Sequence, residues 1–290
     1  GGWSGACGCS QGDRRAGADT VVLRTSGRAE RWTLPDLDAA VQRCRAQNAR
    51  GIRCILDVLG EYARSEEQAR ENRECSSAAI AAIGEHHLDA SLTVKMTAFG
   101  ASFDREAARD SLLRLCEEAR AHGVGFEVDM EGRGLVETTV EAAVACARQG
   151  LPVTLALQTS LDRTTGDLDR IVRHGIKPRL VKGAYPADTD DLTDIRRRFR
   201  ALASELLDRG VPFSAATHDP DLVAWLVEPP AGTVEFAFLM GIADETKRRL
   251  AEEGRAVAEY VPFGKQTGIY VARREAYLAK MAAEGRTPVP

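Results

Sequence analysis

The stretch Tyr260-Val-Pro-Phe-Gly-Lys-Gln-Thr-Gly-Ile-Tyr-Val-Ala-Arg-Arg274 joins a predicted strand to a predicted helix. The apolar run 256–261 favours a strand that stops at Pro262, because proline and the glycine two residues later are typical of turns. From Gly268 onward the pattern predicts a helix that continues to about residue 284. A strand followed by a helix is therefore the unit near the end of the chain, and similar units precede it.

Short apolar or β-branched runs alternate with longer helical patterns from about residue 34 onward. The predicted strands are 52–59, 92–96, 125–130, 153–158, 178–184, 212–217, 234–239 and 256–261. The predicted helices are 66–86, 104–122, 136–149, 167–174, 192–209, 219–228, 244–253 and 268–284, with an extra helix at 36–49 in front. Because parallel neighbours need crossover connections, this alternation predicts an α/β fold, a closed (β/α)₈ TIM-like barrel. An open doubly wound sheet is the alternative, although no Gly-x-Gly-x-x-Gly follows the first strand.

Length and composition indicate a globular protein that acts on a small molecule. The 290 residues suffice for one large domain or two small ones, and we expect an arm at 1–33 and a single barrel domain at 34–290. The 39 basic and 43 acidic residues give a net charge of -4 without long blocks of like charge, so no nucleic-acid partner is expected. No apolar run approaches about eighteen residues, which predicts a cytoplasmic protein with at most peripheral membrane contact.

The seven cysteines are odd in number and form no Cys-x-x-Cys motif, which indicates reduced thiols. Cys7 and Cys9 could contact a metal, but they lie in a glycine-rich stretch. Elsewhere, histidines and carboxylates do not recur at metal-ligand spacing, so we expect no metal site.

Two adjacent arginines on the last predicted helix form a candidate ligand-binding face. Tyr270, Arg273 and Arg274 share one side of the helix, since residues three and four apart are neighbours there. Two planar guanidinium groups suit a carboxylate, which arginine binds through two parallel hydrogen bonds. A solvated basic patch is the alternative interpretation.

Polar residues also gather at the ends of the predicted strands, where the active sites of such barrels lie. They are Lys95, Asp129, Glu131, Gln158, Lys182, Tyr185, Thr217, His218 and Tyr260. Lys95 and Asp129 follow neighbouring strands, so they are predicted to form an ion pair that is either structural or part of the active site. A Schiff-base lysine at Lys95 or Lys182 is the alternative chemistry.

A series of short motifs runs in order from about residue 50 to residue 277. They are Leu56-Asp-Val-Leu-Gly-Glu61, Val94-Lys-Met96, Val128-Asp-Met-Glu131, Gln158, Arg179-Leu-Val-Lys-Gly-Ala-Tyr185, Ala216-Thr-His218, Glu235-Phe236, Tyr260-Val-Pro-Phe-Gly264 and Tyr270-Val-Ala-Arg-Arg274. The motif at 179–185 and the closing Tyr and Arg-Arg unit are the most specific. Together the motifs resemble those of the proline dehydrogenase family, flavin-dependent enzymes with a distorted (β/α)₈ barrel.

The resemblance implies a role for each matching residue. Arg273 and Arg274 would hold a substrate carboxylate, while Lys95, Asp129, Tyr260 and Tyr270 would complete the pocket around the substrate ring. FAD would be held by Gln158, Arg179, Lys182, Gly183, Ala184, Thr217 and His218, with Arg179 near the flavin N5. The implied reaction is oxidation of L-proline to 1-pyrroline-5-carboxylate by hydride transfer to flavin N5, with electrons passed to a quinone or another acceptor.

Three positions depart from the family's pattern. Tyr277 stands where the family usually has glutamate, Ala237 where it has glutamine, and Pro186 where it has a larger side chain. An alternative is therefore the same flavin chemistry on a modified or different cyclic or secondary amino acid in a specialised pathway. A catalytically silent flavin-binding module is a further alternative, and the complete set of predicted substrate-binding residues argues against it.

Overall fold

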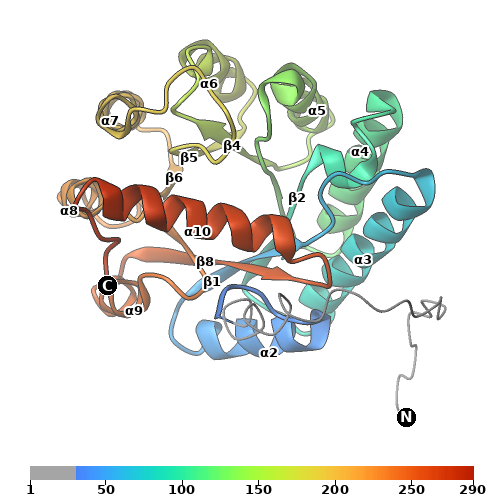
Figure 1. The fold of residues 1–290 in the computed structure, drawn as a ribbon. Helices are drawn as coiled ribbons and strands as arrows, with labels where there is room; N and C mark the ends of the chain where they lie inside the picture. Colours follow the sequence, from blue (N-terminus) through green and yellow to red (C-terminus); the bar gives the residue numbers. More distant parts are fainter. Residues whose placement is uncertain (1–30) are drawn as a thin grey trace, which may run out of the picture.

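The structure, a computed structural model, describes residues 31–290 and forms a closed barrel of eight parallel strands (Figure 1). The strands are β1 (Arg53–Val58), β2 (Ala90–Val94), β3 (Gly125–Val128), β4 (Thr154–Gln158), β5 (Lys177–Val181), β6 (Phe213–Ala216), β7 (Val234–Leu239) and β8 (Ala256–Phe263). Each strand pairs with the next along the chain, and β8 pairs with β1 to close the barrel. The predicted (β/α)₈ barrel is confirmed, and the open doubly wound sheet is wrong.

Nine α-helices accompany the strands within residues 31–290. They are α2 (Leu37–Asn48), α3 (Glu66–Glu85), α4 (Arg105–Ala121), α5 (Val136–Arg148), α6 (Thr164–Arg173), α7 (Leu192–Asp208), α8 (Pro220–Val227), α9 (Asp244–Glu252) and α10 (Gly268–Ala283). Two short 3₁₀ helices, η2 (Met96–Phe99) and η3 (Arg133–Leu135), were not predicted. The expected arm at 1–33, including Cys7 and Cys9, lies outside the described residues except for its last three.

Strand β8 continues through Pro262, where the sequence predicted an end. The carbonyl oxygen of Pro262 accepts a hydrogen bond from Leu34 N at 2.9 Å, and β7 does not extend alongside this residue. A proline fits a strand where no neighbour needs its missing N–H. The prolonged β8 therefore carries the chain to the mouth of the barrel before α10 begins.

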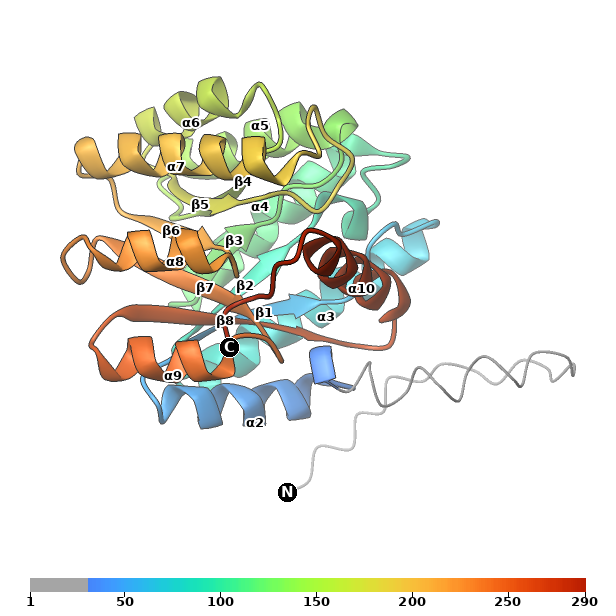
Figure 2. The ribbon, with the colours of Figure 1, turned by 60° about the vertical axis from the view of Figure 1, so that its left-hand side comes forward.

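Helix α10 lies across the open end of the barrel, whereas α3 to α9 surround it (Figures 1 and 2). The place beside β1 and β8 in the outer ring is taken by α2, which packs against both strands. One tie between them is the ion pair of Arg43 on α2 with Glu259 on β8, at 2.6 Å. The departure from a regular barrel thus leaves α10 free to cover the carboxyl ends of the strands.

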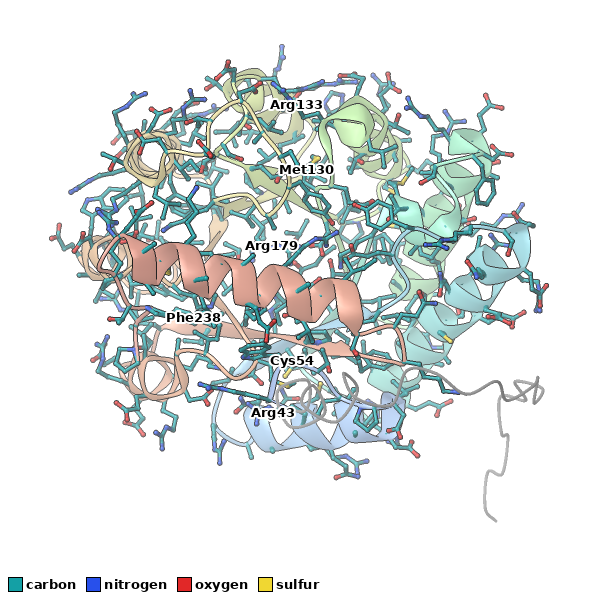
Figure 3. All side chains as sticks on the ribbon, in the orientation of Figure 1. Arg43, Cys54, Met130, Arg133, Arg179 and Phe238 are labelled. Atoms are coloured by element: carbon teal, nitrogen blue, oxygen red, sulfur yellow. The ribbon has the colours of Figure 1, made fainter. Side chains whose placement is uncertain are left out.

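The barrel interior holds charged side chains beside a small apolar cluster of Ile55, Ala237 and Ala258, since every second residue of a strand faces inward. Arg53 bridges Glu127 at 3.0 Å and Glu235 at 2.7 Å near the amino ends of the strands. Glu127 in turn pairs with Arg179 at 2.7 Å. Figure 3 shows Arg179 in the middle of the ring of helices, whereas Arg133 lies at its outer edge. A chain of buried ion pairs therefore leads from the base of the barrel to its mouth.

Candidate active site

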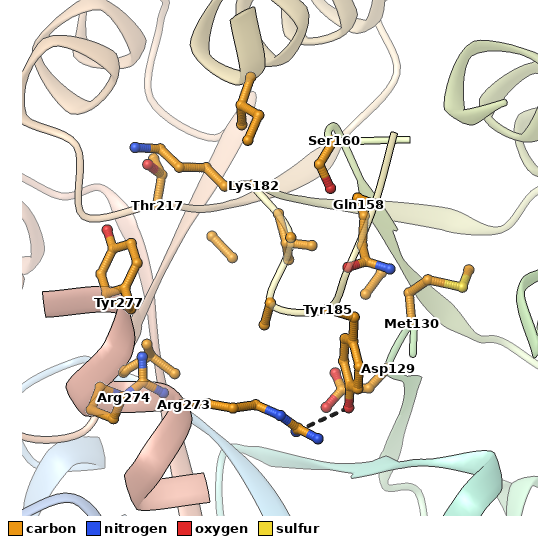
Figure 4. Close-up of a pocket in the computed structure, with 18 of the residues that line it drawn as sticks. Asp129, Met130, Gln158, Ser160, Lys182, Tyr185, Thr217, Arg273, Arg274 and Tyr277 are labelled. Atoms are coloured by element: carbon orange, nitrogen blue, oxygen red, sulfur yellow. Dashed lines mark hydrogen bonds between the residues drawn. The ribbon is translucent and has the colours of Figure 1, made fainter. Parts of the chain in front are cut away.

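A cavity of about 460 Å³ opens between the carboxyl ends of the strands and helix α10 (Figure 4). Every residue predicted to contact substrate or cofactor lines it. The lining includes Lys95, Asp129, Gln158, Arg179, Lys182, Gly183, Ala184, Thr217, His218, Tyr260, Tyr270, Arg273 and Arg274. These residues come from six strand ends and one helix and meet in a single cavity, while their individual roles stay predictions.

Lys95 is the centre of the buried charge network at this end of the barrel. Its ammonium group lies 2.7 Å from Asp57 Oδ1 and 2.9 Å from Asp129 Oδ2, so the predicted Lys95–Asp129 ion pair is present. Burial opposes the positive charge, but the two carboxylates outweigh burial and hold the pKa of Lys95 well above its ordinary value. A Schiff-base nucleophile must be a neutral amine, so this environment argues against that chemistry at Lys95.

Asp129 joins this lysine to the predicted cofactor side of the cavity. Its carboxylate pairs with Arg179 and accepts a hydrogen bond from the Tyr260 hydroxyl at 2.6 Å. The same hydroxyl accepts a hydrogen bond from Lys95 at 2.9 Å. Although burial favours the neutral acid, Lys95 and Arg179 hold the pKa of Asp129 below its ordinary value. Asp129 therefore presents an ionised carboxylate at the cavity wall.

Arg273 closes one side of the cavity. Its Nη1 lies 2.6 Å from Glu61 Oε2 and donates to the Tyr185 hydroxyl at 3.1 Å (Figure 4). The guanidinium also stacks on the Tyr185 ring, 4.3 Å from its centroid, a favourable cation–π distance. An internal carboxylate, that of Glu61, thus already occupies the guanidinium predicted to bind a substrate carboxylate.

Arg274 lies beside Arg273 but has different partners. Its Nη2 donates to the Tyr270 hydroxyl at 2.8 Å, and its carbon Cζ lies 4.9 Å from the centroid of that ring. This contact confirms the shared helix face of positions 270 and 274. The buried Nε of Arg274 has no hydrogen-bond partner. Because an unpaired buried donor is costly, this N–H is suited to a ligand oxygen.

The opposite part of the cavity has features that fit a large planar cofactor. The buried Oε1 of Gln158 and Oγ of Ser160 have no hydrogen-bond partner. Gly183 has φ +120°, and a Cβ there would lie 2.2 Å from Ser160 Oγ, so the position requires glycine. Unpaired polar atoms beside a backbone without a side chain fit the polar edge of a flavin ring. This observation supports the predicted cofactor assignment of Gln158 and Gly183.

His218 and Lys182 line the same region. His218 Nε2 accepts a hydrogen bond from Leu239 N at 3.1 Å, which requires that this ring nitrogen carry no proton. Burial, reinforced by the positive charges of Arg274, Lys247 and Lys182, holds the pKa of His218 well below its ordinary value. Lys182 pairs with Asp219 at 2.8 Å.

We predict that the neutral state of His218 makes the protein less stable in mild acid. The unfolded chain binds a proton near pH ~6.5, while the folded histidine stays neutral to lower pH. The free energy of unfolding should therefore fall as pH decreases below ~6.5, by up to about 1.4 kcal/mol per pH unit from this group. Denaturant unfolding of wild type and His218→Gln between about pH 5 and 8 measures this pH dependence of the free energy of unfolding. The exposed His87→Gln is the control, and equal pH slopes for wild type and His218→Gln would contradict the prediction.

Sequence reasoning missed three buried carboxylates among these contacts. Asp57 lies in the first strand and Glu61 just after it, inside a motif that was quoted without a role for either residue. Asp219 accepts from Lys182 and from Arg196 and also caps α8. The period-two pattern of β1 could have revealed Asp57, because Arg53, Ile55 and Asp57 occupy the inward positions. No local signal predicts the contact of Glu61 with a helix more than 200 residues later.

Comparison with known proteins agrees with this geometry. Residues 40–192 match the family model described as proline dehydrogenase. Over 259 residues the chain is 32% identical to proline dehydrogenase 1 of Bacillus subtilis strain 168, with 85% of each chain covered. The chain belongs to the proline dehydrogenase family. A further relative, the proline dehydrogenase of Deinococcus radiodurans, is 29% identical over 290 residues, covering 92% of this chain and 93% of that relative.

Solved structures share the proline dehydrogenase barrel. Proline utilization A (PutA) from Bdellovibrio bacteriovorus superposes with a TM-score of 0.77 at 19% identity over 87% of this chain. PutA from Bradyrhizobium japonicum gives a TM-score of 0.73 at 24% identity over 84% of this chain. The chain spans 33% and 30% of the lengths of those two proteins. These likenesses confirm the fold.

The departures from the proline dehydrogenase pattern all face the cavity. Tyr277, Ala237 and Pro186 belong to its lining. The Tyr277 ring lies 6.1 Å from the His218 ring, and Ala237 packs with Ile55 in the barrel. A neutral phenol therefore replaces a carboxylate beside the predicted cofactor residues, and a small side chain replaces a long amide.

Two further properties bear on partners. Within residues 31–290, no group of three or more His, Cys, Asp or Glu side chains is placed to hold a metal ion. Over the same range, no helix has the length and apolar character needed to cross a bilayer.

Proposed function

We propose that the chain oxidises L-proline to 1-pyrroline-5-carboxylate with FAD bound in the cavity, and that the electrons pass to a quinone or another acceptor. Membership of the proline dehydrogenase family supports proline oxidation. The observation that carries the proposal is that two arginines, a buried Lys-Asp-Tyr network and unpaired polar atoms line one cavity. The two arginines suit a carboxylate, and the unpaired polar atoms suit a flavin.

The arginine pair would orient the substrate through its carboxylate. Arg274 offers a buried Nε without a partner, and Arg273, which Glu61 holds through Nη1, keeps N–H groups on Nε and Nη2 for a second contact. Two fixed cations on one helix turn define the position of a carboxylate in the cavity. Holding a reactant in this way lowers the entropic part of the activation barrier of the reaction.

The Lys95, Asp129 and Tyr260 network would act on the substrate ring by charge rather than by proton transfer. Lys95 is held protonated and Asp129 ionised, so neither suits a general base near neutral pH. Removal of a hydride from a neutral amine leaves positive charge on the C=N unit. The ionised Asp129, whose side chain is 14% exposed, lines the cavity together with Lys95 and Tyr260 and is the member of the network that would stabilise that charge.

The cofactor, when bound, supplies the redox chemistry by accepting a hydride at the flavin ring. On the protein side, Gln158, Arg179, Lys182, Gly183, Ala184, Thr217 and His218 would hold it. Arg179 is fixed between Glu127 and Asp129, so its cation would not depend on the cofactor for its position. No covalent attachment is needed, because the contacts are polar and cationic.

The purified protein is therefore expected to be yellow, to release its flavin on acid precipitation, and to lose its visible absorbance under anaerobic conditions when proline is added. Mixing with proline amide should leave the flavin oxidised, because the carboxylate contact is missing. A colourless protein that takes up no added FAD would overturn the proposal.

A second candidate substrate is a modified or different cyclic or secondary amino acid. Ala237 and Pro186, both smaller than the usual side chains, favour it because they leave more room at the cavity wall. An anaerobic bleaching panel of ring-substituted and larger cyclic amino acids separates the two candidates by their kcat/KM values.

We also propose a cytoplasmic location. The buried cysteines Cys44, Cys54, Cys116 and Cys146 are free thiols, which fits a reducing compartment.

A further inference from the structure

Tyr62 adopts a backbone conformation that its side chain disfavours. Its φ is +59°, in the left-handed region, and the residue lies in the loop after β1. The other described non-glycine residues with positive φ are His87 and Ala243. His87 follows the C-terminus of α3, where this conformation is common, and Ala243 is the N-cap of α9. A tyrosine held in this region is a strained residue, and such residues occur where the surrounding structure fixes them, often at functional sites.

Hydrogen bonds on both sides hold the strained turn in place. Before it, Leu59 N donates to Phe263 O at 2.9 Å, and the Asn72 side chain donates to Gly60 O at 2.9 Å. After it, Ala63 N donates to Thr97 O at 3.1 Å. The turn is therefore tied to β8, to α3 and to the segment after β2, and its conformation does not depend on the tyrosine side chain.

The turn brings two consecutive side chains onto one guanidinium. Glu61 lies 2.6 Å from Arg273 Nη1, and the Tyr62 hydroxyl accepts from Arg273 Nη2 at 3.3 Å. The Tyr62 ring also lies under the guanidinium, 5.9 Å from its carbon Cζ to the ring centroid. In an extended chain successive side chains point to opposite sides, so this shared contact requires the left-handed residue.

We infer that Tyr62 is a positioning residue for substrate binding, because it fixes the Arg273 guanidinium in the orientation in which the remaining N–H groups can bind the substrate carboxylate. This inference rests on the proposed function. Glu61 and Tyr185 use Nη1, and the Tyr62 contact takes one N–H of Nη2, which leaves the Nε–H and the second Nη2–H of Arg273 for a carboxylate. The side chain of Tyr62 is 39% exposed, so its loss removes little packing from the core.

The test compares Tyr62→Gly with His87→Gly. Both variants replace a left-handed residue by glycine, which adopts this conformation without strain, but exposed His87 lies at the end of α3 that leads into β2, away from the cavity. For Tyr62→Gly we expect KM for proline to rise about ten-fold, with kcat changed less than about two-fold, where ten-fold equals ~1.4 kcal/mol of binding. The melting temperature should stay equal or rise in both variants, and His87→Gly should keep the wild-type KM.

Two further measurements separate positioning from a merely structural role. Tyr62→Phe keeps the ring but loses the hydroxyl, so its KM should lie between those of wild type and Tyr62→Gly. Binding of a cyclic carboxylate without an oxidisable amine, followed by the shift in flavin absorbance, should weaken by the same factor as KM in each variant.

The outcomes distinguish the inference from the function on which it rests. If wild type reacts with proline and Tyr62→Gly keeps the wild-type KM, or if its KM rises only together with a lower melting temperature, the positioning role is wrong. If wild type leaves its flavin oxidised with proline and binds no cyclic carboxylate, the proposed function fails and the inference fails with it.

Discussion

Arg274→Met is expected to lower kcat/KM for proline about 10- to 150-fold with little change in flavin content. The substitution keeps the aliphatic stem but removes the buried Nε, which has no partner within the protein, and the contact with Tyr270. A hydrogen bond to a charged group contributes roughly 1.5–3 kcal/mol, and each ~1.4 kcal/mol corresponds to a factor of ten. Steady-state kinetics with proline and a flavin absorbance ratio measure both quantities.

The controls for Arg274→Met address charge and substrate. Arg249→Met removes an exposed arginine of α9 that pairs with Glu253. The kinetics of this variant should therefore match those of wild type. Arg274→Lys should recover only part of the loss, because a point charge cannot reproduce the planar fork. Any residual activity with proline amide should be nearly equal in wild type and Arg274→Met, since the same contact is missing from both. Wild-type kinetics in Arg274→Met would exclude this arginine from carboxylate binding.

Lys95→Met is expected to destabilise the fold by roughly 3–5 kcal/mol and to abolish most turnover. The lysine is buried and is the cation closest to Asp57, whose second oxygen has no hydrogen-bond partner. Its removal leaves uncompensated charge in the barrel, which is far more costly than losing an exposed pair. Lys95 is shared by two carboxylates, those of Asp57 and Asp129, which is the reason to expect a large stability loss together with the loss of turnover. Urea unfolding of the flavin-free protein measures it.

The pH dependence of Lys95→Met follows from Asp57. Burial raises the pKa of this carboxyl, and in the variant the opposing effect of Lys95 is gone. A folded pKa above the unfolded value gives stability that is present in acid and lost as pH rises. The stability deficit should therefore grow from pH ~4 toward neutrality.

Matched variants identify the cause of the Lys95→Met effect. Lys95→Met combined with Asp57→Asn should regain part of the stability, because one stranded charge is removed. Lys177→Met breaks another lysine-carboxylate pair, that of Lys177 with Glu235 at 2.9 Å, in which the lysine side chain is 35% exposed. The loss of stability should therefore be about 1 kcal/mol or less. Equal losses for Lys95→Met and Lys177→Met would mean that burial of the network does not matter.

The order of secondary structure was readable from the chain because its cause is local. Short apolar runs such as Val234–Leu239 and amphipathic runs such as Leu192–Asp208 indicate strand and helix respectively. Eight alternations then leave few topologies, because parallel strands require crossovers. Strand-end residues such as Lys95 and Asp129 follow from the barrel itself, in which the carboxyl ends of all strands meet.

The sequence by itself therefore determined the barrel, the family and the set of residues that meet at its mouth. Only the tertiary structure decided which side chains are in contact, such as Lys95 with Asp57 and Arg273 with Glu61 and Tyr62. It also decided that α2, and not α10, packs beside β1 and β8. Periodicity is a property of a few neighbouring residues, whereas these contacts join segments far apart in the chain. Their geometry is set by barrel closure and by the strained turn at Tyr62, and neither leaves a repeating pattern in the sequence.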